Sequence, residues 1–418
     1  MTNPGFLLAE FHGDLIKNIL CFLAEHYYPD NIEELAQRLI YIEPSNRDWA
    51  VGYNPLEAGD QPFSAVLELM EIFKKFWGNT TYWGPRMDEL LRNTLIILCE
   101  NNLTMLEIQP FLTHKGFRQR LLEHVSNEDV RDYFLYHYNT LSQGMEKMYA
   151  GPILNRTSRF LMDPSISLIL GQQENTINFR DAMDSGQWIL LNLGKGQQKE
   201  NLRILGTIFL TKINQAAQSR IDIDEDERRP FFLFIDEIQH LDFLSHDAEE
   251  ILSQARKFGI SLCASHQHLE QLPRELRSAF LGNAGTQIFF RLSHRDASQI
   301  SSEMDQKERH LIERKLIDLK TREAYLKIKG KRPMLLQTPY VDSIKVPDEV
   351  IEEIKTASFR NWAKPVNEVK EEIAARRRLW MHDETVVGSN FQEDTFESLK
   401  DDETVMPDHS VQEGQNEW

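Results

Sequence analysis

Two adjacent carboxylates, Asp236 and Glu237, are the residues whose type and position most directly suggest chemistry. They follow residues 231–235, five apolar residues that begin after a proline, and such a run predicts a strand buried on both faces. In open α/β sheets, ligands bind at the carboxyl ends of the strands. There, one carboxylate can hold the water shell of Mg²⁺ and the next can orient an attacking water. The pair alone is equally consistent with a strand end that merely exposes two acids.

Two further predicted strands also end in polar residues. The first covers residues 260–265 and runs into the cluster Ser265-His266-Gln267, after a helix predicted over residues 247–258. The second covers residues 286–291 and ends at Arg291. Three successive strands with polar carboxyl ends predict a parallel sheet whose edge binds a nucleotide.

Three segments carry a resemblance to a known family. In chain order they are FFLFIDEIQHL, ILSQARKFGISLCASHQHLEQLP and NAGTQIFFRLSHRDA. They resemble the C-terminal half of the motor domain of HerA/FtsK-type P-loop ATPases, in particular the TraG/TraD-type conjugative coupling proteins of type IV secretion. The resemblance runs from about Gly5 to about Tyr340. It implies an α/β fold with a RecA-like P-loop NTPase sheet, mostly parallel and truncated at its N-terminus, and an inserted all-α subdomain.

The resemblance also implies roles for individual residues. Asp236 and Glu237 match the Walker B pair, and Asp236 would hold Mg²⁺ through water. Gln267 matches a glutamine that senses the γ-phosphate, and Arg256 matches an arginine that reaches the nucleotide of a neighbouring subunit. Each role is chemically sound, because a guanidinium spreads developing phosphoryl charge and an amide can orient water. The implied cofactors are ATP and Mg²⁺.

Near the N-terminus, a predicted strand over residues 5–11 is followed by His12-Gly13-Asp14-Leu15. The resembled family often has Asp-Pro-His-Gly-Asp-Leu at this point, and this chain carries Glu10-Phe11 in place of Asp-Pro. His12 and Asp14, together with Arg291, are therefore additional candidates for the site.

The phosphate-binding loop of a P-loop ATPase, GxxxxGK followed by Ser or Thr, does not occur in the 418 residues. Gly194-Lys195-Gly196 follows a predicted strand but lacks the earlier glycine and the following hydroxyl, so we interpret it as a strand-to-helix turn. In the resembled family the loop directly precedes the strand that matches residues 5–11. We therefore expect a fragment, a misplaced start or a natural chain that lost nucleotide binding, with the first two favoured. Such a chain should not hydrolyse ATP alone, and whether it is itself an enzyme stays open.

The pattern along the chain predicts five regions. They are an N-terminal part of the motor domain (1–60), an all-α inserted subdomain (61–175), a C-terminal part of the motor domain with Walker B (176–342), a charged helical extension (343–385) and an acidic disordered tail (386–418). The extension contains a basic triplet, residues 376–378, which we interpret as a solvated helix end.

Composition limits the class of protein. Hydrophobic residues make up 41% and charged residues 27%, as in ordinary globular proteins. Three scattered cysteines favour reduced cytosolic thiols, and neither a signal peptide nor an apolar run of roughly 20 residues is visible. We expect a cytoplasmic protein, with attachment to the inner face of the cell membrane through partners or a missing N-terminal region as a further option. The net charge of −18 argues against a generally basic nucleic-acid binder but leaves room for a locally basic DNA-facing surface.

These observations support three functional hypotheses. The leading one is a DNA-translocating motor ATPase of the conjugative coupling or HerA type, acting as a homo-hexameric ring on single- or double-stranded DNA, with secretion-channel or relaxase partners. The second is a non-catalytic scaffold or DNA-docking subunit with the same fold. The third is an ATPase of phage packaging or defence, because a fold alone does not decide the substrate.

Overall fold

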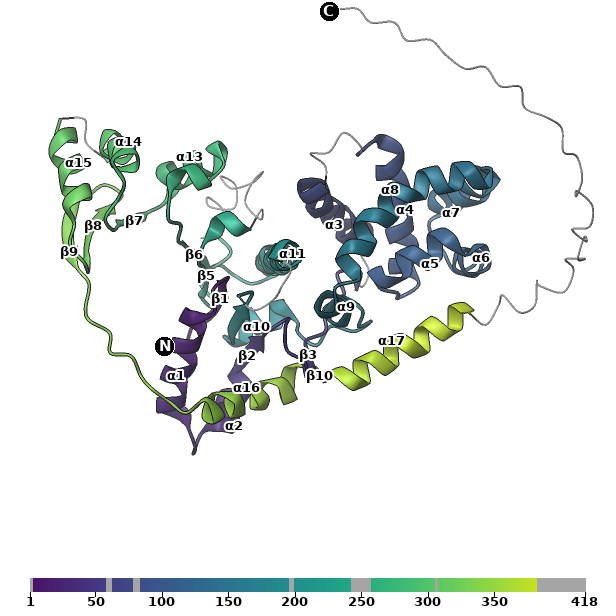
Figure 1. Cartoon of the computed structure of the whole chain (residues 1–418), viewed down its shortest axis with the longest axis horizontal. Coiled ribbons are helices and arrows are strands. Elements are labelled where there is room, and N and C mark those ends of the chain that lie inside the picture. Colours follow the sequence, from purple (N-terminus) through teal and green to yellow (C-terminus); the bar gives the residue numbers. More distant parts are fainter. Residues whose placement is uncertain are drawn as a thin grey trace, which may run out of the picture.

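The computed structural model describes residues 3–57, 62–77, 83–194, 199–241, 257–304 and 307–381. A parallel sheet forms the centre of the molecule (Figure 1). A body of helices lies on one side of it, and a smaller antiparallel sheet with its own helices lies on the other. This arrangement confirms the predicted α/β class with an all-α subdomain, whereas the boundaries of the five regions stay predictions.

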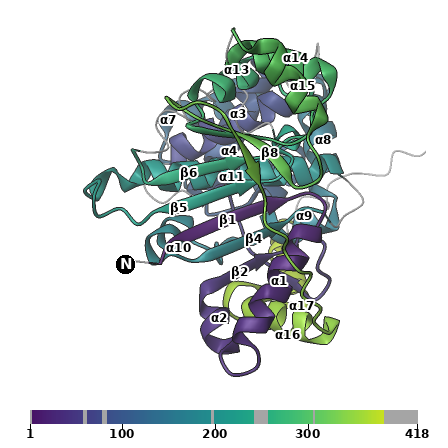
Figure 2. The same cartoon turned by 90° about the vertical axis from the view of Figure 1, so that its left-hand side faces the viewer.

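The central sheet has five strands, and every pair of neighbours is parallel. In spatial order they are β2 (Leu39–Ile42), β4 (Trp188–Asn192), β1 (Gly5–Glu10), β5 (Phe231–Ile235) and β6 (Ile260–Ala264), as Figure 2 shows. All five are short apolar runs that end in polar residues. Since parallel strands point the same way, their polar carboxyl ends meet at one edge of the sheet.

One face of the sheet is fully covered. Leu7, Ile189 and Leu233 are at most 4% exposed and belong to the main core. Helices α10 (Phe179–Ser185) and α11 (Lys199–Gln218) contribute to the same core, as does the helical body. Each such aliphatic side chain contributes about 1.5–3 kcal/mol when buried, so this face supplies much of the stability.

The other face is covered only in part. Helices α1 (Asp14–Tyr27), α2 (Ile32–Arg38) and α16 (Asp348–Trp362) pack on it through Leu8, Tyr41 and Leu190. No described helix continues over β5 and β6, and there Phe234 is 37% exposed. The prediction that residues 231–235 are buried on both faces is therefore wrong, because the covering helices end over β1. Ser261 and Cys263 on β6 are exposed on the same open face.

The helical body follows β3 (Trp49–Ala50) in the chain. Its helices are α3 (Pro62–Trp77), α4 (Pro85–Glu100), α5 (Ile108–Thr113), α6 (Lys115–Leu122), α7 (Glu128–Asp132), α8 (Gln143–Leu161) and α9 (Pro164–Leu170). Their apolar faces merge with the covered face of the sheet into a single core. The body is therefore packed onto the sheet and not merely tethered to it.

The predicted strand at residues 286–291 does not belong to the parallel sheet. It forms β7 (Thr286–Phe289), which pairs antiparallel with β8 (Glu323–Ile328), and β8 pairs with β9 (Met334–Gln337). β8 and β9 form a hairpin that turns at Gly330, and β7 pairs with this hairpin in a separate sheet. An apolar run ending in polar residues does not reveal its partner strand, which explains the wrong assignment. Helices α14 (His294–Met304) and α15 (Arg309–Asp318) pack on one face of this sheet, and α13 (Arg274–Asn283) precedes it in the chain.

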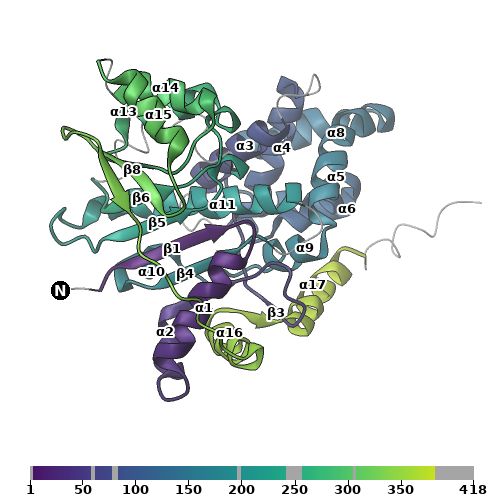
Figure 3. The same cartoon turned by 60° about the vertical axis from the view of Figure 1, so that its left-hand side comes forward.

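After β9 the chain returns across the molecule to the helical body (Figures 1 and 3). Beyond α16, β10 (Lys364–Pro365) pairs with β3, and α17 (Val366–Met381) packs near α9. Arg376 on α17 is only 8% exposed, so its interpretation as part of a solvated helix end is wrong. Its guanidinium instead donates to Glu107 Oε1 at 2.8 Å and to the Gly171 carbonyl at 2.7 Å. Arg377 and Arg378 are exposed as expected.

The acidic tail predicted at residues 386–418 lies outside the described residues. None of the helices that the structure describes combines the length and the apolar character that a membrane span needs.

Candidate functional site

The first half of the site is formed by Asp236 and Ser265, which follow the neighbouring strands β5 and β6. The Asp236 N–H donates to the Ala9 carbonyl at 3.0 Å, so its backbone is still held by β1. Ser265 N–H donates to the Ile235 carbonyl at 3.0 Å, and the Ser265 hydroxyl donates to Asp236 Oδ1. The edge of the sheet therefore presents the partly exposed carboxylate of Asp236 with the hydroxyl of Ser265 beside it.

The second half is Glu237, whose backbone turns into the left-handed region with φ 57° and ψ 57°. For a residue with a Cβ this conformation costs about 1–2 kcal/mol. The side chain is only 6% exposed, and Gln267 Nε2 donates to its Oε1 at 2.6 Å. Gln239 donates to Oε2, and the Glu237 N–H reaches the Ser265 hydroxyl oxygen at 3.3 Å. The strained turn therefore holds both carboxylate oxygens in fixed positions beside the end of β6.

These residues fit Mg²⁺ that arrives with a nucleotide. Among the described residues, no group of three or more His, Cys, Asp or Glu side chains could hold a metal ion without further ligands. Mg²⁺ is typically bound by one or two carboxylates, with waters and substrate phosphates as its other ligands. Asp236, with the Ser265 hydroxyl beside it, offers that kind of oxygen ligand set.

A cationic side chain contacts His240, close to this edge of the sheet. Arg203 on α11 places Nη2 2.8 Å from Nδ1 of His240, which lies just beyond Glu237 in the chain. Burial lowers the pKa of His240, and the Arg203 guanidinium lowers it further. The ring of His240 lies 5.1 Å from that of Phe11, which stands where the resembled family often has proline. Neither Arg203 nor His240 was a candidate from the sequence, because only the packing of α11 against this edge reveals the pair.

The remaining candidates from the sequence lie in different places. His12 and Asp14 are exposed at the start of α1, and His12 is near enough to His240 to affect its charge state. Arg291 is exposed just after β7, the strand that joins the separate antiparallel sheet, so the structure does not bring it to Asp236. Arg256 lies outside the described residues.

Glu10, at the end of β1, has a structural task that the sequence did not suggest. It is 1% exposed, and its carboxylate accepts hydrogen bonds from the Leu15 and Ile16 N–H groups at 2.9 and 2.7 Å. These are free N–H groups in the first turn of α1, where a negative charge is favourable. Glu10 therefore fixes α1 against the sheet edge and does not point at Asp236.

Two half-buried histidines predict how stability depends on pH. Burial lowers the pKa of both His240 and His266, so the folded protein keeps them neutral where the unfolded chain binds protons. The stability they contribute is present above about pH 6.5 and is lost as the pH falls below it. When the pH is lowered from 7.5 to 5.5, the melting temperature should therefore fall less for His240→Gln and for His266→Gln than for the wild type. His310→Gln, at an exposed position, is the control and should behave like the wild type. An equal fall in the melting temperature of the wild type and all three variants would contradict the prediction.

Comparisons with known proteins bear on this geometry. Residues 159–334 match the family model of the type IV secretion-system coupling protein DNA-binding domain. A search of curated proteins gives no sequence match. Among solved structures, the bacterial conjugative coupling protein TrwBdeltaN70 in its unbound monoclinic form has a TM-score of 0.52 at 12% identity, covering 82% of this chain and 80% of that one.

Two further structures are less similar. Plasmid coupling protein TrwB in complex with ADP and Mg²⁺ has a TM-score of 0.49 at 12% identity, covering 83% of this chain and 87% of that one. TrwB with the non-hydrolysable GTP analogue GDPNP has a TM-score of 0.48 at 13% identity, covering 82% and 87%. The unbound structure, at 12% identity, shows a shared fold. The family model of the type IV secretion-system coupling protein DNA-binding domain therefore matches residues 159–334, and the chain shares the RecA-like fold of the conjugative coupling protein TrwBdeltaN70.

Proposed function

We propose that the chain is part of a DNA-translocating motor of the conjugative coupling type and carries the side of the nucleotide site at which water attacks. One observation supports this most strongly. The ends of two neighbouring parallel strands form two hydrogen-bonded pairs, Asp236 with Ser265 and Glu237 with Gln267. Such a pairing of carboxylates with a hydroxyl and an amide suits the hydrolysis of a nucleoside triphosphate.

In this proposal each side chain has one task. Asp236 and Ser265 hold the water shell of Mg²⁺, and the metal neutralises phosphate charge when it is bound. Glu237 accepts a proton from the attacking water, since each of its oxygens keeps a free lone pair beside its present hydrogen bond. Gln267, already 2.6 Å from Glu237, can exchange that contact for one to the γ-phosphate or the water.

The phosphate side of the site would be added next to β6. The outer edge of β6 pairs with no other strand in the described part of the chain, and Phe234 and Cys263 lie exposed beside it. Unpaired edges and exposed apolar faces are unfavourable unless another element covers them. We place a strand beside β6, a Gly-rich phosphate-binding loop after it, and a helix over Phe234. The loop would then lie next to Asp236.

Assembly and substrate complete the proposal, and both rest on the family resemblance. A homo-hexameric ring would bring Arg256 of one subunit to the nucleotide of the next. DNA is the proposed substrate of translocation, and relaxase and secretion-channel proteins are the proposed partners.

The function can be tested in the cells that carry the natural gene. We expect Glu237→Gln in that gene to abolish the transfer of DNA between cells while the protein level stays unchanged. Unchanged transfer would favour the scaffold hypothesis. Loss of phage production or of phage resistance, with transfer unchanged, would favour packaging or defence.

A further inference from the structure

Positive charge gathers on the β8–β9 hairpin, although the chain as a whole carries a net charge of −18. Residues 320–332 contain six Lys and Arg residues and one acidic residue. The basic residues are Lys320, Arg322, Lys327, Lys329, Lys331 and Arg332. A basic segment in an acidic protein raises the local concentration of anionic partners.

The charges at the tip of the hairpin are available for binding. Lys329, Lys331 and Arg332 surround Gly330, whose φ of 79° makes the turn, and all three are exposed. None of the three forms an ion pair with any residue that the structure describes. The tip points away from the rest of the molecule at the left of Figure 3. Lys327 is less free, because its Nζ lies 3.4 Å from the Glu303 carbonyl.

Apolar side chains lie among these cations. On the face of the small sheet away from its helices, Ile288 is 51% exposed and Met334 is 47% exposed. Phe290, just after β7, is 54% exposed. Cations interspersed with exposed apolar and aromatic groups are typical of surfaces that bind single-stranded nucleic acid.

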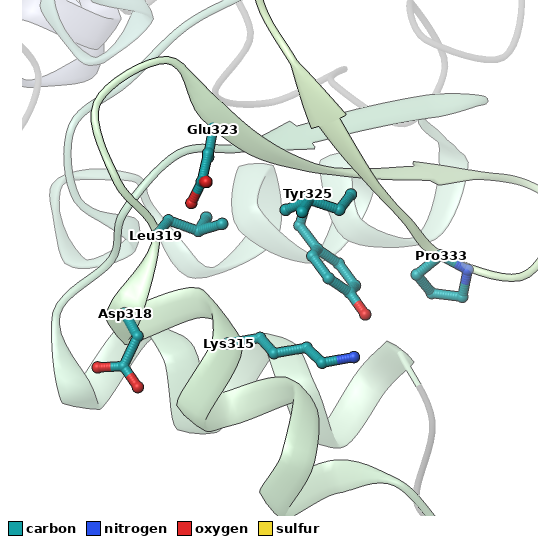
Figure 4. Close-up of a pocket in the computed structure, with 7 residues that line it drawn as sticks. Lys315, Asp318, Leu319, Glu323, Tyr325 and Pro333 are labelled. Carbon is teal, nitrogen blue, oxygen red and sulfur yellow. The ribbon is translucent and has the colours of Figure 1, made fainter.

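A pocket adjoins the hairpin on its helical face. Its volume is about 350 Å³, and it is lined by Lys315, Asp318, Leu319, Glu323, Tyr325, Pro333 and Leu335 (Figure 4). Lys315 extends beneath the Tyr325 ring, with Nζ 6.0 Å from the ring centroid, and Pro333 directly follows the tip residue Arg332. Asp318 and Glu323 lie at the opposite end. The walls can pack against a flat base, and the carboxylates can accept hydrogen bonds from its amino groups.

We propose that the β8–β9 hairpin and this pocket form a binding surface for single-stranded DNA. Lys329, Lys331 and Arg332 contact its phosphates, and the pocket receives one unstacked base. A duplex would meet the same cations, but its bases are stacked and paired and cannot enter the pocket. The inference rests on the proposed function and adds to it a location for the DNA.

The test uses the whole chain and a fluorescent single-stranded DNA of mixed sequence, with binding followed by anisotropy at several salt concentrations. The triple variant Lys329→Ala, Lys331→Ala, Arg332→Ala should bind about 10- to 100-fold more weakly at 0.1 M salt. For this variant, the slope of the logarithm of the binding constant against the logarithm of the salt concentration should be shallower by about 2. Each of the three lost phosphate contacts reduces the magnitude of this slope by about 0.7. The conservative pair Lys329→Arg, Lys331→Arg should bind like the wild type.

A matched control removes the same charge elsewhere. Lys370, Arg377 and Arg378 are exposed on α17, on the far side of the molecule in Figure 1, and their triple alanine variant should bind nearly as well as the wild type. Equal losses in both triple variants would overturn the hairpin site but leave DNA as the partner. A wild-type chain that binds no DNA would count against both this inference and the DNA partner of the proposed function.

The pocket is tested separately. Leu335→Ala should weaken binding of the single strand a few-fold, leave the salt dependence unchanged and leave duplex binding unchanged. Equal affinity of the wild type for single strand and duplex, or no effect of Leu335→Ala, would overturn the role of the pocket. Unchanged melting temperatures establish that each variant is folded.

Discussion

Replacing Arg376 with methionine should lower the free energy of unfolding by about 3–5 kcal/mol, because it leaves a buried carboxylate without its cation. Glu107 is fully buried, and Arg376 Nε donates to its Oε1 at 2.8 Å. Glu107 Oε2 also accepts hydrogen bonds from the backbone N–H and the hydroxyl of Thr104. Thr104 and Glu107 thereby cap the N-terminus of a short helical segment in the helical body. Losing the guanidinium also removes a hydrogen bond to the Gly171 carbonyl. Urea unfolding measured by circular dichroism would give the difference.

Two controls distinguish this buried pair from a general effect on α17. Arg377→Met, one position along the same helix but exposed, should change the free energy of unfolding by less than about 0.5 kcal/mol. The double variant Arg376→Met, Glu107→Gln should have a higher free energy of unfolding than Arg376→Met alone, because no unpaired charge stays buried. A loss below about 1 kcal/mol for Arg376→Met would show that the pair contributes little, as exposed ion pairs do.

The sequence predicted the strands of the central sheet well, for a physical reason. Parallel strands that are buried on at least one face are continuous apolar runs, and each run in this sheet ends in polar residues at the same edge. The structure also brings Glu237 and Gln267, both candidates from the sequence, into contact, while the roles that the resemblance implied for them stay predictions. A single apolar run or a single family motif was therefore sufficient to predict which residues lie at the carboxyl-end edge of the central sheet.

The predictions that proved wrong all depended on a distant partner. The exposure of Phe234 depends on which helices reach β5, and the place of β7 depends on its pairing with β8, which joins Thr286 to Ile328. The burial of Arg376 depends on Glu107, which is 269 residues away in the chain. Likewise Arg203 meets His240 only because α11 packs against the sheet edge. A local sequence pattern cannot predict contacts between residues that lie so far apart in the chain.

The largest expected effect on function follows from Glu237→Gln. If Glu237 accepts a proton from the attacking water, an amide of the same size removes that capacity and keeps most of the packing. We expect ATP hydrolysis by the motor to fall by about 10²–10⁴-fold, in line with the loss of a general base. In cells with the natural gene, the frequency of DNA transfer should fall in parallel, and an immunoblot would check that the protein level is unchanged.

Glu237→Gly is the matched control, because it separates the carboxylate from the backbone conformation. Glycine adopts φ 57° without the cost that a Cβ adds, so this variant should be as stable as the wild type or more stable by up to about 1 kcal/mol. It should nevertheless lose transfer as completely as Glu237→Gln. Loss of function together with equal or higher stability would show that the chain keeps a strained carboxylate at this turn for its chemistry. Normal transfer with glutamine at this position would remove Glu237 as the base, and a large drop in the melting temperature of the glycine variant would instead assign it a structural role.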